Sequence, residues 1–298
     1  VHYASITYSC ITRGPVIFKK GNYAISLLLS EEFIKNGGTL RCLTGVKEIL
    51  VKDNEVTGVV TDSNEKFLTK HILANLSPNV VYGNLILDNV VPNKAKSLTN
   101  SRSFGARGVS VYIGLNKTKE ELGLENMTYF IYHSLNSDKE FKRMHGVFSG
   151  NLTAILKNSS IASSCLVFSS LIFGGAFDKL VTKENYFAMK EKFAESLVSS
   201  FEEATGVNIR DAIEEIEVAT PVTFARYTGH PEGVIYGYMA TSYDNLIPRI
   251  LNEENEIFIK GLHFCGSFGS WLSSSSATYI NGEQEALKTL EEMENEKV

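Results

Sequence analysis

The 298-residue sequence has no uninterrupted apolar run of about 18 residues, which is the length that a membrane-spanning helix needs. Its densest apolar region, residues 161–176, is interrupted by four serines and a glycine pair. The sequence also has no basic stripe, and its net charge at pH 7 is −5. These absences argue against a membrane span and against a nucleic-acid partner.

Cysteine is scarce as well. The four cysteines (Cys10, Cys42, Cys165 and Cys265) form no CxxC motif, and no histidine stands at a metal-ligand spacing. We therefore predict neither a disulfide framework nor a metal site. The low cysteine count, with no signal peptide at the start, predicts a cytoplasmic protein with reduced thiols, and leaves peripheral membrane association open.

The first part of the sequence has the pattern of an α/β domain with a β excursion. A periodic apolar helix is expected over 21–36 and ends at Gly37 and Gly38, before a short strand at 39–42. Alternating apolar residues separated by Asp/Asn turns then predict an antiparallel β-meander over 46–68. A further strand is expected at 71–74.

The middle of the sequence predicts a mixed sheet covered by helices. The expected strands are 108–115, 127–133, 165–172 and 216–219, and the expected helices are 81–95 and the amphipathic segment 186–205. Residues 220–237, which are rich in glycine and proline, read as a turn-rich linker.

The end of the sequence has the strongest chemical signal. A strand over 256–264, a glycine turn at 265–269 and a helix over 278–293 are expected there. The turn and the helix start would offer unpaired N–H groups and the positive end of the helix dipole, which suit phosphate oxygens or the electron-rich edge of a flavin. An ordinary βα turn would have the same pattern.

Four segments stand out by their order and spacing. They are GNYAISLLLSEEFIKNGGTLRCLTGVKEI, HILANLSPNVVY, ATPVTFARYTGHPEGVIYGY and GLHFCGSFGSWLSSSSATYINGEQEAL. Taken together they resemble the phytoene desaturase, carotenoid isomerase and retinol saturase group, which lies within the amine-oxidase-like FAD-dependent oxidoreductases. The closing segment departs from that group, because serines stand where its members commonly have glycine and proline.

The resemblance implies FAD as the cofactor. The implied contacts are Val46 at the adenine, Asn75 and Ser77 where the chain passes the cofactor again, Gly266 and Ser267 beside the pyrophosphate and ribityl chain, and Ile280, Asn281 and Gly282 under the flavin ring. The sequence has no GxGxxG fingerprint, which the group carries before the matched region. We therefore expect this chain alone to bind FAD weakly or not at all, with a missing N-terminal half or a partner subunit completing the site.

The resemblance also implies an α/β (α+β) fold and a domain plan. An incomplete FAD-binding, Rossmann-like domain is expected from 21–78 and 236–298, and a substrate domain from 79–235 with a segment at 1–20. The implied function is that of the C-terminal portion of an oxidoreductase acting on C–C or C=C bonds of an apolar, polyene-like substrate. No residue is predicted to be catalytic, since a flavin carries the chemistry. The alternative is a non-catalytic split subunit or remnant that binds an apolar ligand or completes a partner.

Overall fold

The computed structural model describes residues 23–125, 128–145, 152–158, 164–270 and 275–296. By their contacts the residues divide into two units, Val1–Gly45 and Val46–Val298. In the first unit, the predicted helix is present as α2 (Tyr23–Lys35), which is followed by Gly37 at a φ of +88°. The strand predicted for 39–42 is wrong: residues 39–41 have no regular secondary structure, Cys42 is a bend, and none of them pairs with a described strand. The predicted segment at 1–20 lies outside the described residues.

The second unit begins with the predicted β-meander. It consists of β1 (Val46–Lys52), β2 (Glu55–Thr61) and β3 (Lys66–Leu68), paired antiparallel in that order. The turn between β1 and β2 contains Asp53 and Asn54, both at positive φ, which is the geometry of a tight hairpin and one that Asp and Asn tolerate. The meander prediction is confirmed.

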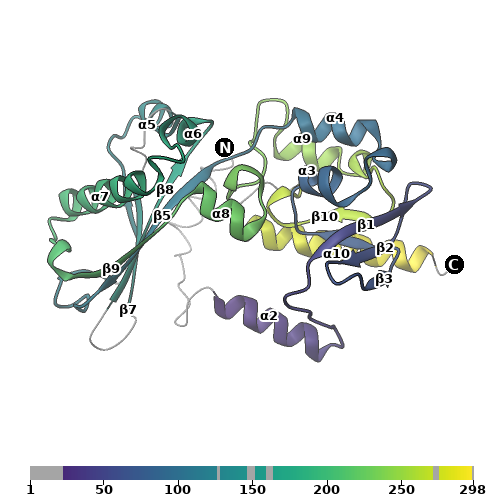
Figure 1. Ribbon diagram of the computed structural model, residues 1–298, viewed down its shortest axis with the longest axis horizontal. Helices are drawn as coiled ribbons and strands as arrows, with labels where there is room; N and C mark the ends of the chain where they lie inside the picture. Colours follow the sequence, from purple (N-terminus) through teal and green to yellow (C-terminus); the bar gives the residue numbers. More distant parts are fainter. Residues whose placement is uncertain (1–22, 126–127, 146–151, 159–163, 271–274, 297–298) are drawn as a thin grey trace. The chain divides into compact units, whose positions relative to one another are not determined.

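A parallel pair of strands follows from distant parts of the sequence. β4 (Ile72–Ala74) pairs with β10 (Leu262–Phe264), and α10 (Ser275–Asn295) contacts β10 (Figure 1). The strand predicted for 256–264 is shorter than expected. It is interrupted by Gly261 at a φ of +77°, where a Cβ atom would lie 1.9 Å from the carbonyl oxygen of Lys70. The backbone therefore turns there before β10 begins.

The single helix predicted for 81–95 is also wrong. The chain forms α3 (Pro78–Val80), a π-helical turn η1 (Val81–Leu85), a 3-10 turn η2 (Asp88–Val90) and α4 (Asn93–Ser101). Ile86 is extended, with φ −117° and ψ 139°, and Pro92 precedes α4 with an extended backbone. These two positions break the helix.

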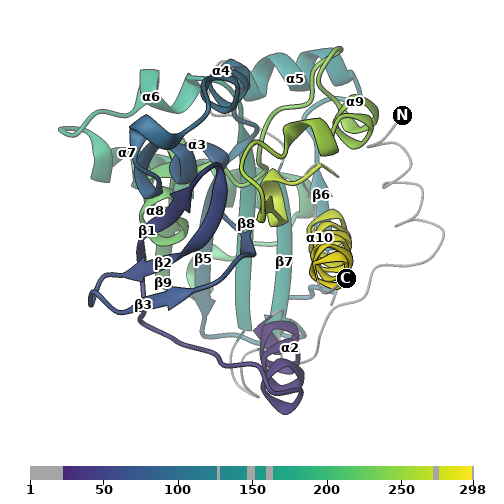
Figure 2. The same cartoon turned by 90° about the vertical axis from the view of Figure 1, so that its right-hand side faces the viewer.

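The middle of the chain forms a five-stranded sheet. Its strands are β5 (Arg107–Leu115), β6 (Thr128–Ile131), β7 (Leu152–Asn158), β8 (Ser164–Ile172) and β9 (Ile213–Ala219), in the order β6-β7-β8-β5-β9. Every pairing is antiparallel, which corrects the predicted mixed sheet. The strands β6, β7 and β8 are consecutive both in the sequence and in the sheet, as in a meander, and they run side by side in Figure 2.

Helices cover this sheet as predicted. The amphipathic helix α7 (Tyr186–Thr205) contacts β5, β6, β7 and β9, and buries Phe193 and Phe201 against Ile113 and Phe168. Gly206, at a φ of +72°, ends the helix. The remaining helical elements are α5 (Ser137–His145), α6 (Ala176–Leu180), η3 (Arg210–Ala212), α8 (Pro221–Thr228), η4 (Pro231–Gly233), α9 (Leu246–Leu251), η5 (Glu254–Glu256) and η6 (Gly266–Phe268).

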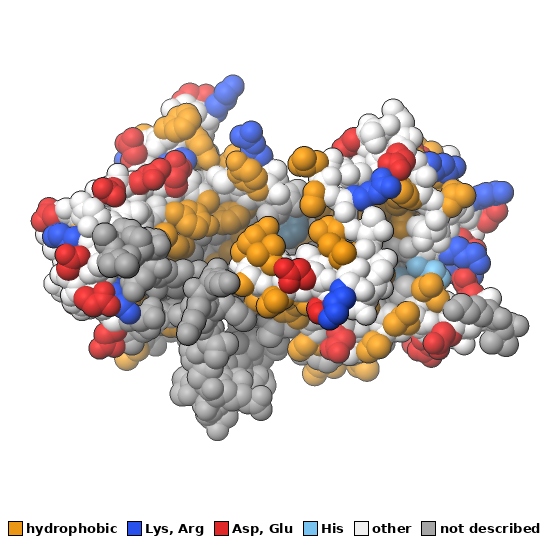
Figure 3. Space-filling model, turned by 90° about the horizontal axis from the view of Figure 1, so that it is seen from below, with side chains coloured by type: hydrophobic (Ala, Val, Ile, Leu, Met, Phe, Trp, Pro, Cys, Tyr) orange, Lys and Arg blue, Asp and Glu red, His pale blue; other side chains and the backbone are white. Residues whose placement is uncertain are grey.

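The helix α8 lies in the segment predicted to be a linker, so that prediction is wrong for residues 221–228. Thr220 and Thr223 form a reciprocal capping box, and Pro221 occupies the first turn, where its missing N–H costs nothing. Among the described helices, none is both long and apolar enough to cross a membrane. Acidic and basic side chains are interspersed on the face shown in Figure 3.

Candidate functional site

The carboxyl ends of β4 and β10 lie next to each other. Ala74 is paired with Phe264, and the backbone N–H of Cys265 donates to the carbonyl of Ala74 at 3.1 Å. In open sheets with parallel strands, ligands bind just beyond the carboxyl ends of the strands. The residues that follow β4 and β10 are therefore the candidate site.

Asn75 and Gly266 meet at this position. Gly266 has a φ of +75°, and a Cβ atom there would lie 1.9 Å from the Asn75 Oδ1 atom. Only glycine therefore allows the exposed Asn75 amide to lie against this turn. Ser267 follows directly, within η6. The structure thus brings three of the predicted cofactor residues together.

Ser77 lies two residues beyond Asn75, but its side chain is fully buried. Its hydroxyl oxygen accepts a hydrogen bond from the backbone N–H of Asn79 at 3.3 Å and caps α3. The side chain of Asn79 in turn accepts a hydrogen bond of 2.6 Å from the Tyr238 hydroxyl. Ser77 therefore shapes the turn after β4.

Of the three residues predicted at the start of α10, Asn281 alone reaches the turn after β10. A Cβ atom at Gly269 would lie 1.9 Å from the Asn281 Oδ1 atom. Asn281 is fully buried, and neither polar atom of its amide has a hydrogen-bond partner among the described residues. Ile280 is 40% exposed, and no atom lies within 4 Å of the position that a Cβ atom of Gly282 would take.

Val46 lies in another sheet. It is the first residue of β1, pairs with Thr61 and is 41% exposed. Its predicted contact with an adenine stays a prediction. The loop around Trp271, where the sequence departs from the resembled group, lies outside the described residues.

A cavity of about 300 Å³ lies beside the strand ends. Phe264, Phe268 and Gly269 line it where β10 ends, and Glu285 and Glu292 of α10 line another part. Its lining also includes Tyr238 and two arginines, Arg102 and Arg249. The cavity therefore has both an aromatic and a strongly charged wall.

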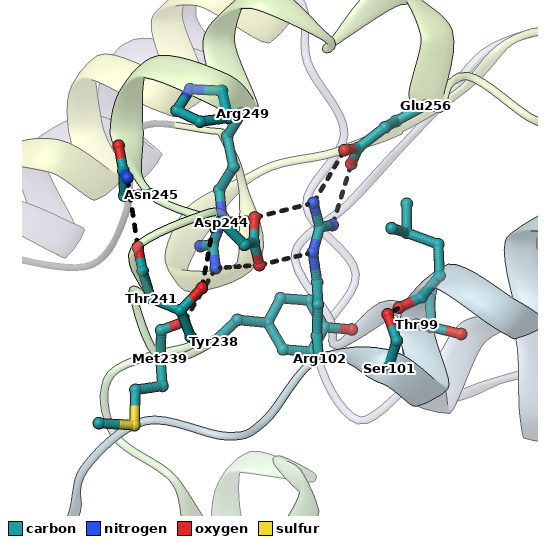
Figure 4. Close-up of polar contacts among 12 residues, drawn as sticks. Thr99, Ser101, Arg102, Tyr238, Met239, Thr241, Asp244, Asn245, Arg249 and Glu256 are labelled. Carbon is teal, nitrogen blue, oxygen red and sulfur yellow. Dashed lines mark hydrogen bonds and ion pairs between the residues drawn. The ribbon is translucent and has the colours of Figure 1, made fainter.

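The charged wall is a network in which one aspartate joins two arginines (Figure 4). Arg249 Nε and Arg102 Nε donate to the two oxygens of Asp244 at 2.8 and 3.1 Å. Arg102 also donates from Nη1 and Nη2 to the carboxylate of Glu256, at 2.9 and 2.8 Å. The guanidinium of Arg102 lies 5.5 Å from the centre of the Tyr238 ring, within cation–π distance.

Tyr238 and Arg102, two members of this wall, keep their protons at neutral pH. Burial raises the pKa of the Tyr238 hydroxyl to about 12, so it stays protonated and donates to Asn79. Burial alone would lower the pKa of Arg102, but hydrogen bonds and charge from Glu256 and Asp244 raise it overall. Neither Tyr238 nor Arg102 is therefore a general acid or base that titrates near neutrality. Sequence reasoning missed this wall, since its members stand far apart in the chain with no diagnostic spacing.

Taken together, these residues fit a dinucleotide such as FAD. Glycine allows close backbone approach after β10, the exposed Asn75 amide lies on that turn, and the buried Asn281 amide lacks a described partner. A carboxyl-end position with backbone N–H groups is a donor set suited to phosphate oxygens.

Comparison with known proteins gives one informative sequence match. No family model matches the chain. The all-trans-retinol 13,14-reductase of Danio rerio is 30% identical over 191 residues, which cover 54% of this chain and 30% of that protein. The chain thus spans under a third of the length of this relative.

Two solved structures share the fold. An oxidoreductase from Methanosarcina mazei has a TM-score of 0.57 at 12% identity, covering 91% of this chain and 55% of that one. A putrescine oxidase variant from a redesign of cofactor binding has a TM-score of 0.55 at 10% identity, covering 92% and 53%. The described chain therefore has the fold found in about half of each of these oxidoreductases.

Proposed function

We propose that this chain forms part of an FAD-dependent oxidoreductase acting on C–C or C=C bonds of an apolar, polyene-like substrate. The observation that carries the proposal is the strand-end turn, in which Asn75 lies against Gly266, within a chain similar to a retinol reductase. The fold shared with two other oxidoreductases supports it.

Asn75, Gly266 and Ser267 would hold the cofactor at the strand ends, with Asn281 supporting the turn through Gly269. Bound there, a flavin supplies hydride transfer to or from a carbon–carbon unit. The chain's own residues would bind the cofactor, orient the substrate and exclude water from the site. Phe104 stacks on Tyr238 with ring centres 5.8 Å apart, and Tyr238 meets Phe268 edge-on at 5.2 Å.

The face of the five-stranded sheet opposite α7 carries two apolar side chains that an apolar substrate would contact. Side chains alternate between the two faces of a strand, so Tyr112 and its pairing partner Val167 point away from the buried Val111 and Phe168. Tyr112 is 43% exposed and Val167 is half-buried. The same face also carries the exposed Glu217, which pairs with Tyr112, and the hydrogen-bonded hydroxyls of Ser110 and Ser169, so apolar and polar groups are mixed on it.

Titration of the isotope-labelled chain with FAD, followed by amide chemical shifts, tests the cofactor part of the proposal. This measurement detects weak binding, which is what we expect from this chain alone. Shifts should concentrate at Asn75, Gly266 and Ser267. Gly266→Ala should weaken binding about 10-fold or more, which is about 1.4 kcal/mol, because its Cβ atom would displace the Asn75 amide.

Gly206→Ala is the matched control. Gly206 also has a positive φ, of +72°, but no atom lies within 4 Å of its Cβ position, so this variant has the same backbone strain far from the site. It should bind FAD as the wild type does. Shifts confined to other parts of the chain, or equal effects of the two variants, would contradict the proposed site.

A further inference from the structure

Two histidines and a glutamate meet where α10 contacts the parallel strand pair. His71 directly precedes β4, His263 is the central residue of β10, and Glu292 lies on α10. One nitrogen or oxygen atom from each of the three lies within 4.8 Å of the others. The Glu292 Oε2 atom is 3.0 Å from His263 Nε2 and 3.4 Å from His71 Nδ1.

The imidazole of His71 is the unusual member. Its side chain is only 10% exposed, and neither ring nitrogen has a hydrogen-bond partner among the described residues. Buried polar atoms in folded proteins are almost always hydrogen-bonded or bound to an ion or water, because leaving them unpaired costs free energy. The His71 imidazole lies 3.4 Å from the Glu292 carboxylate, so a cation that both groups bind would give this nitrogen the partner it lacks.

The charges around the cluster support a cation. Glu285 lies 3.4 Å from Lys288, and Glu296 lies 3.1 Å from Lys70. Among the described residues, the only ion-pair partners of Glu292 within 4.0 Å are the two histidines. The carboxylate placed between two imidazoles is thus the one with no lysine within 4.0 Å, although Lys260 interacts with it at longer range.

We propose that His71, His263 and Glu292 bind a divalent transition-metal ion of the Zn²⁺ class. Two imidazoles and one carboxylate form a three-residue donor set that Zn²⁺ uses when its fourth position is open. Ligand atoms ~2.1 Å from a tetrahedral ion lie ~3.4 Å apart. The 3.4 Å separation therefore matches one edge of such a site, whereas the 3.0 Å separation is a hydrogen-bond distance between His263 and Glu292 that would lengthen around an ion.

The outer contact of His263 has the form expected around a metal-bound histidine. Glu285 is buried, and its Oε2 atom lies 3.3 Å from His263 Nδ1. Glu296 Oε2 is the carboxylate oxygen near His71 Nε2, but at 3.8 Å it is too far away for a hydrogen bond. A histidine that binds a metal through one nitrogen commonly donates its other N–H to a carboxylate, which fixes the tautomer and ring orientation.

The site would join α10 to β4 and β10, and two of its members, His263 and Glu292, also line the cavity beside the strand ends. Sequence spacing did not predict the site, because the two histidines are far apart in the sequence. The prediction of no metal site is therefore one that this proposal revises.

The alternative to a metal ion bound at His263 is a proton on its imidazole ring. Burial alone would lower the pKa of this imidazole, but its contacts with Glu285 and Glu292 raise it. Metal binding to histidine requires the neutral ring, so Zn²⁺ affinity should fall as the pH is lowered. The two occupants are distinguished by direct metal binding.

The experiment is a calorimetric titration of the chelator-treated chain with Zn²⁺, together with the visible spectrum of the Co²⁺-loaded chain. We expect one ion per chain and the intense absorption of four-coordinate Co²⁺. His71→Gln and Glu292→Gln should each weaken binding at least 10-fold. His133→Gln and Glu294→Gln are matched controls, since both residues are exposed and lie outside the cluster, and they should bind as the wild type does.

Circular dichroism of each variant shows that it is folded before it is titrated, and His263 is left unchanged because it is buried at the centre of β10. Absence of stoichiometric Zn²⁺ binding by the wild-type chain would overturn the proposal in favour of the protonated His263. Binding that His71→Gln and Glu292→Gln leave intact would overturn it as well, by placing the ion elsewhere.

Discussion

Asp244 is the residue on which the charged wall of the cavity depends. Its two oxygens accept hydrogen bonds from Arg249 and Arg102, and its side chain is 17% exposed. Arg249 is 5% exposed and Arg102 11%, so both guanidinium groups are largely removed from water. A buried charge that loses its partner is costly, because desolvation is no longer compensated.

We therefore expect Asp244→Asn to lower the free energy of unfolding at pH 7 by about 3 kcal/mol. The reason is that the variant leaves the positive charge of Arg249 buried without its carboxylate. Urea unfolding followed by circular dichroism measures the change. Asp88→Asn is the matched control, since Asp88 pairs with Lys96 while 92% exposed, and exposed pairs contribute about 0–1 kcal/mol.

The same variant has a defined pH dependence. Burial alone would raise the pKa of Asp244, but Arg249 and Arg102 hold it below its usual value. A depressed pKa in the folded state stabilises the fold above the unfolded pKa of about 3.9, and this contribution is lost as the pH falls through the folded value. The difference between wild type and Asp244→Asn should be constant from about pH 7 to 5 and shrink below about pH 4. A difference that persists undiminished to pH 2 would contradict this assignment.

The cap of α8 is a local helix-start signal in a segment whose glycine and proline content predicted a linker. The segment from Thr220 to Gly237 is rich in glycine and proline, and this predicted a linker. The first residues nonetheless contain a Thr-Pro-x-Thr pattern, with the backbone N–H of Thr220 donating to Thr223 Oγ1 at 3.1 Å. The hydroxyl of Thr220 also lies 2.9 Å from that of Tyr186 on α7.

Thr220→Ala should therefore lower the free energy of unfolding by ~1–2 kcal/mol, since it removes the cap of α8 and the hydrogen bond with Tyr186. Thr220→Ser keeps the hydroxyl and should recover most of the loss. Thermal unfolding of the two variants against wild type provides the measurement. Equal destabilisation by both would attribute the effect to the buried methyl group of Thr220.

Elements whose apolar pattern continues over many residues were predictable from the sequence. α7 has the predicted bounds, because its apolar residues recur on one side over 20 residues and Gly206 ends it. β5 and β8 match the predicted strands to within a residue. The failures lie where tertiary geometry decides, as at Gly261, whose backbone turn against Lys70 shortens β10.

The candidate site was predictable only in part, for the same reason. The turn residues Asn75, Gly266 and Ser267 are near their partners because they follow adjacent strands, which a sequence pattern can indicate. The Arg102–Asp244 pair joins residues that no local period links. His71 and His263 likewise become neighbours only after β4 and β10 pair.

The second unit has two principal hydrophobic cores, and different elements surround each of them. One lies between the five-stranded sheet and α7, and includes Ile113, Phe168 and Phe201. The other lies around β4 and β10, and includes Val81 and Ile259. A small cluster of Val234, Tyr238 and Phe268 is separate from both. Since each core buries its own side chains, we expect a substitution that destabilises one core to increase local unfolding mainly in the elements around that core.

Phe201→Ala tests this. Phe201 is fully buried, with its ring centre 5.1 Å from that of Phe168 and 5.5 Å from that of Tyr129, so its removal should cost about 3–5 kcal/mol. Hydrogen exchange should speed up most at the amides of β5, β8 and α7, and least at those of β4, β10 and α10. Phe187→Ala, at a 75% exposed position of α7, is the control and should change neither set. An equal increase in both sets would show instead that the two cores unfold as one cooperative unit, because only global opening exposes amides in both.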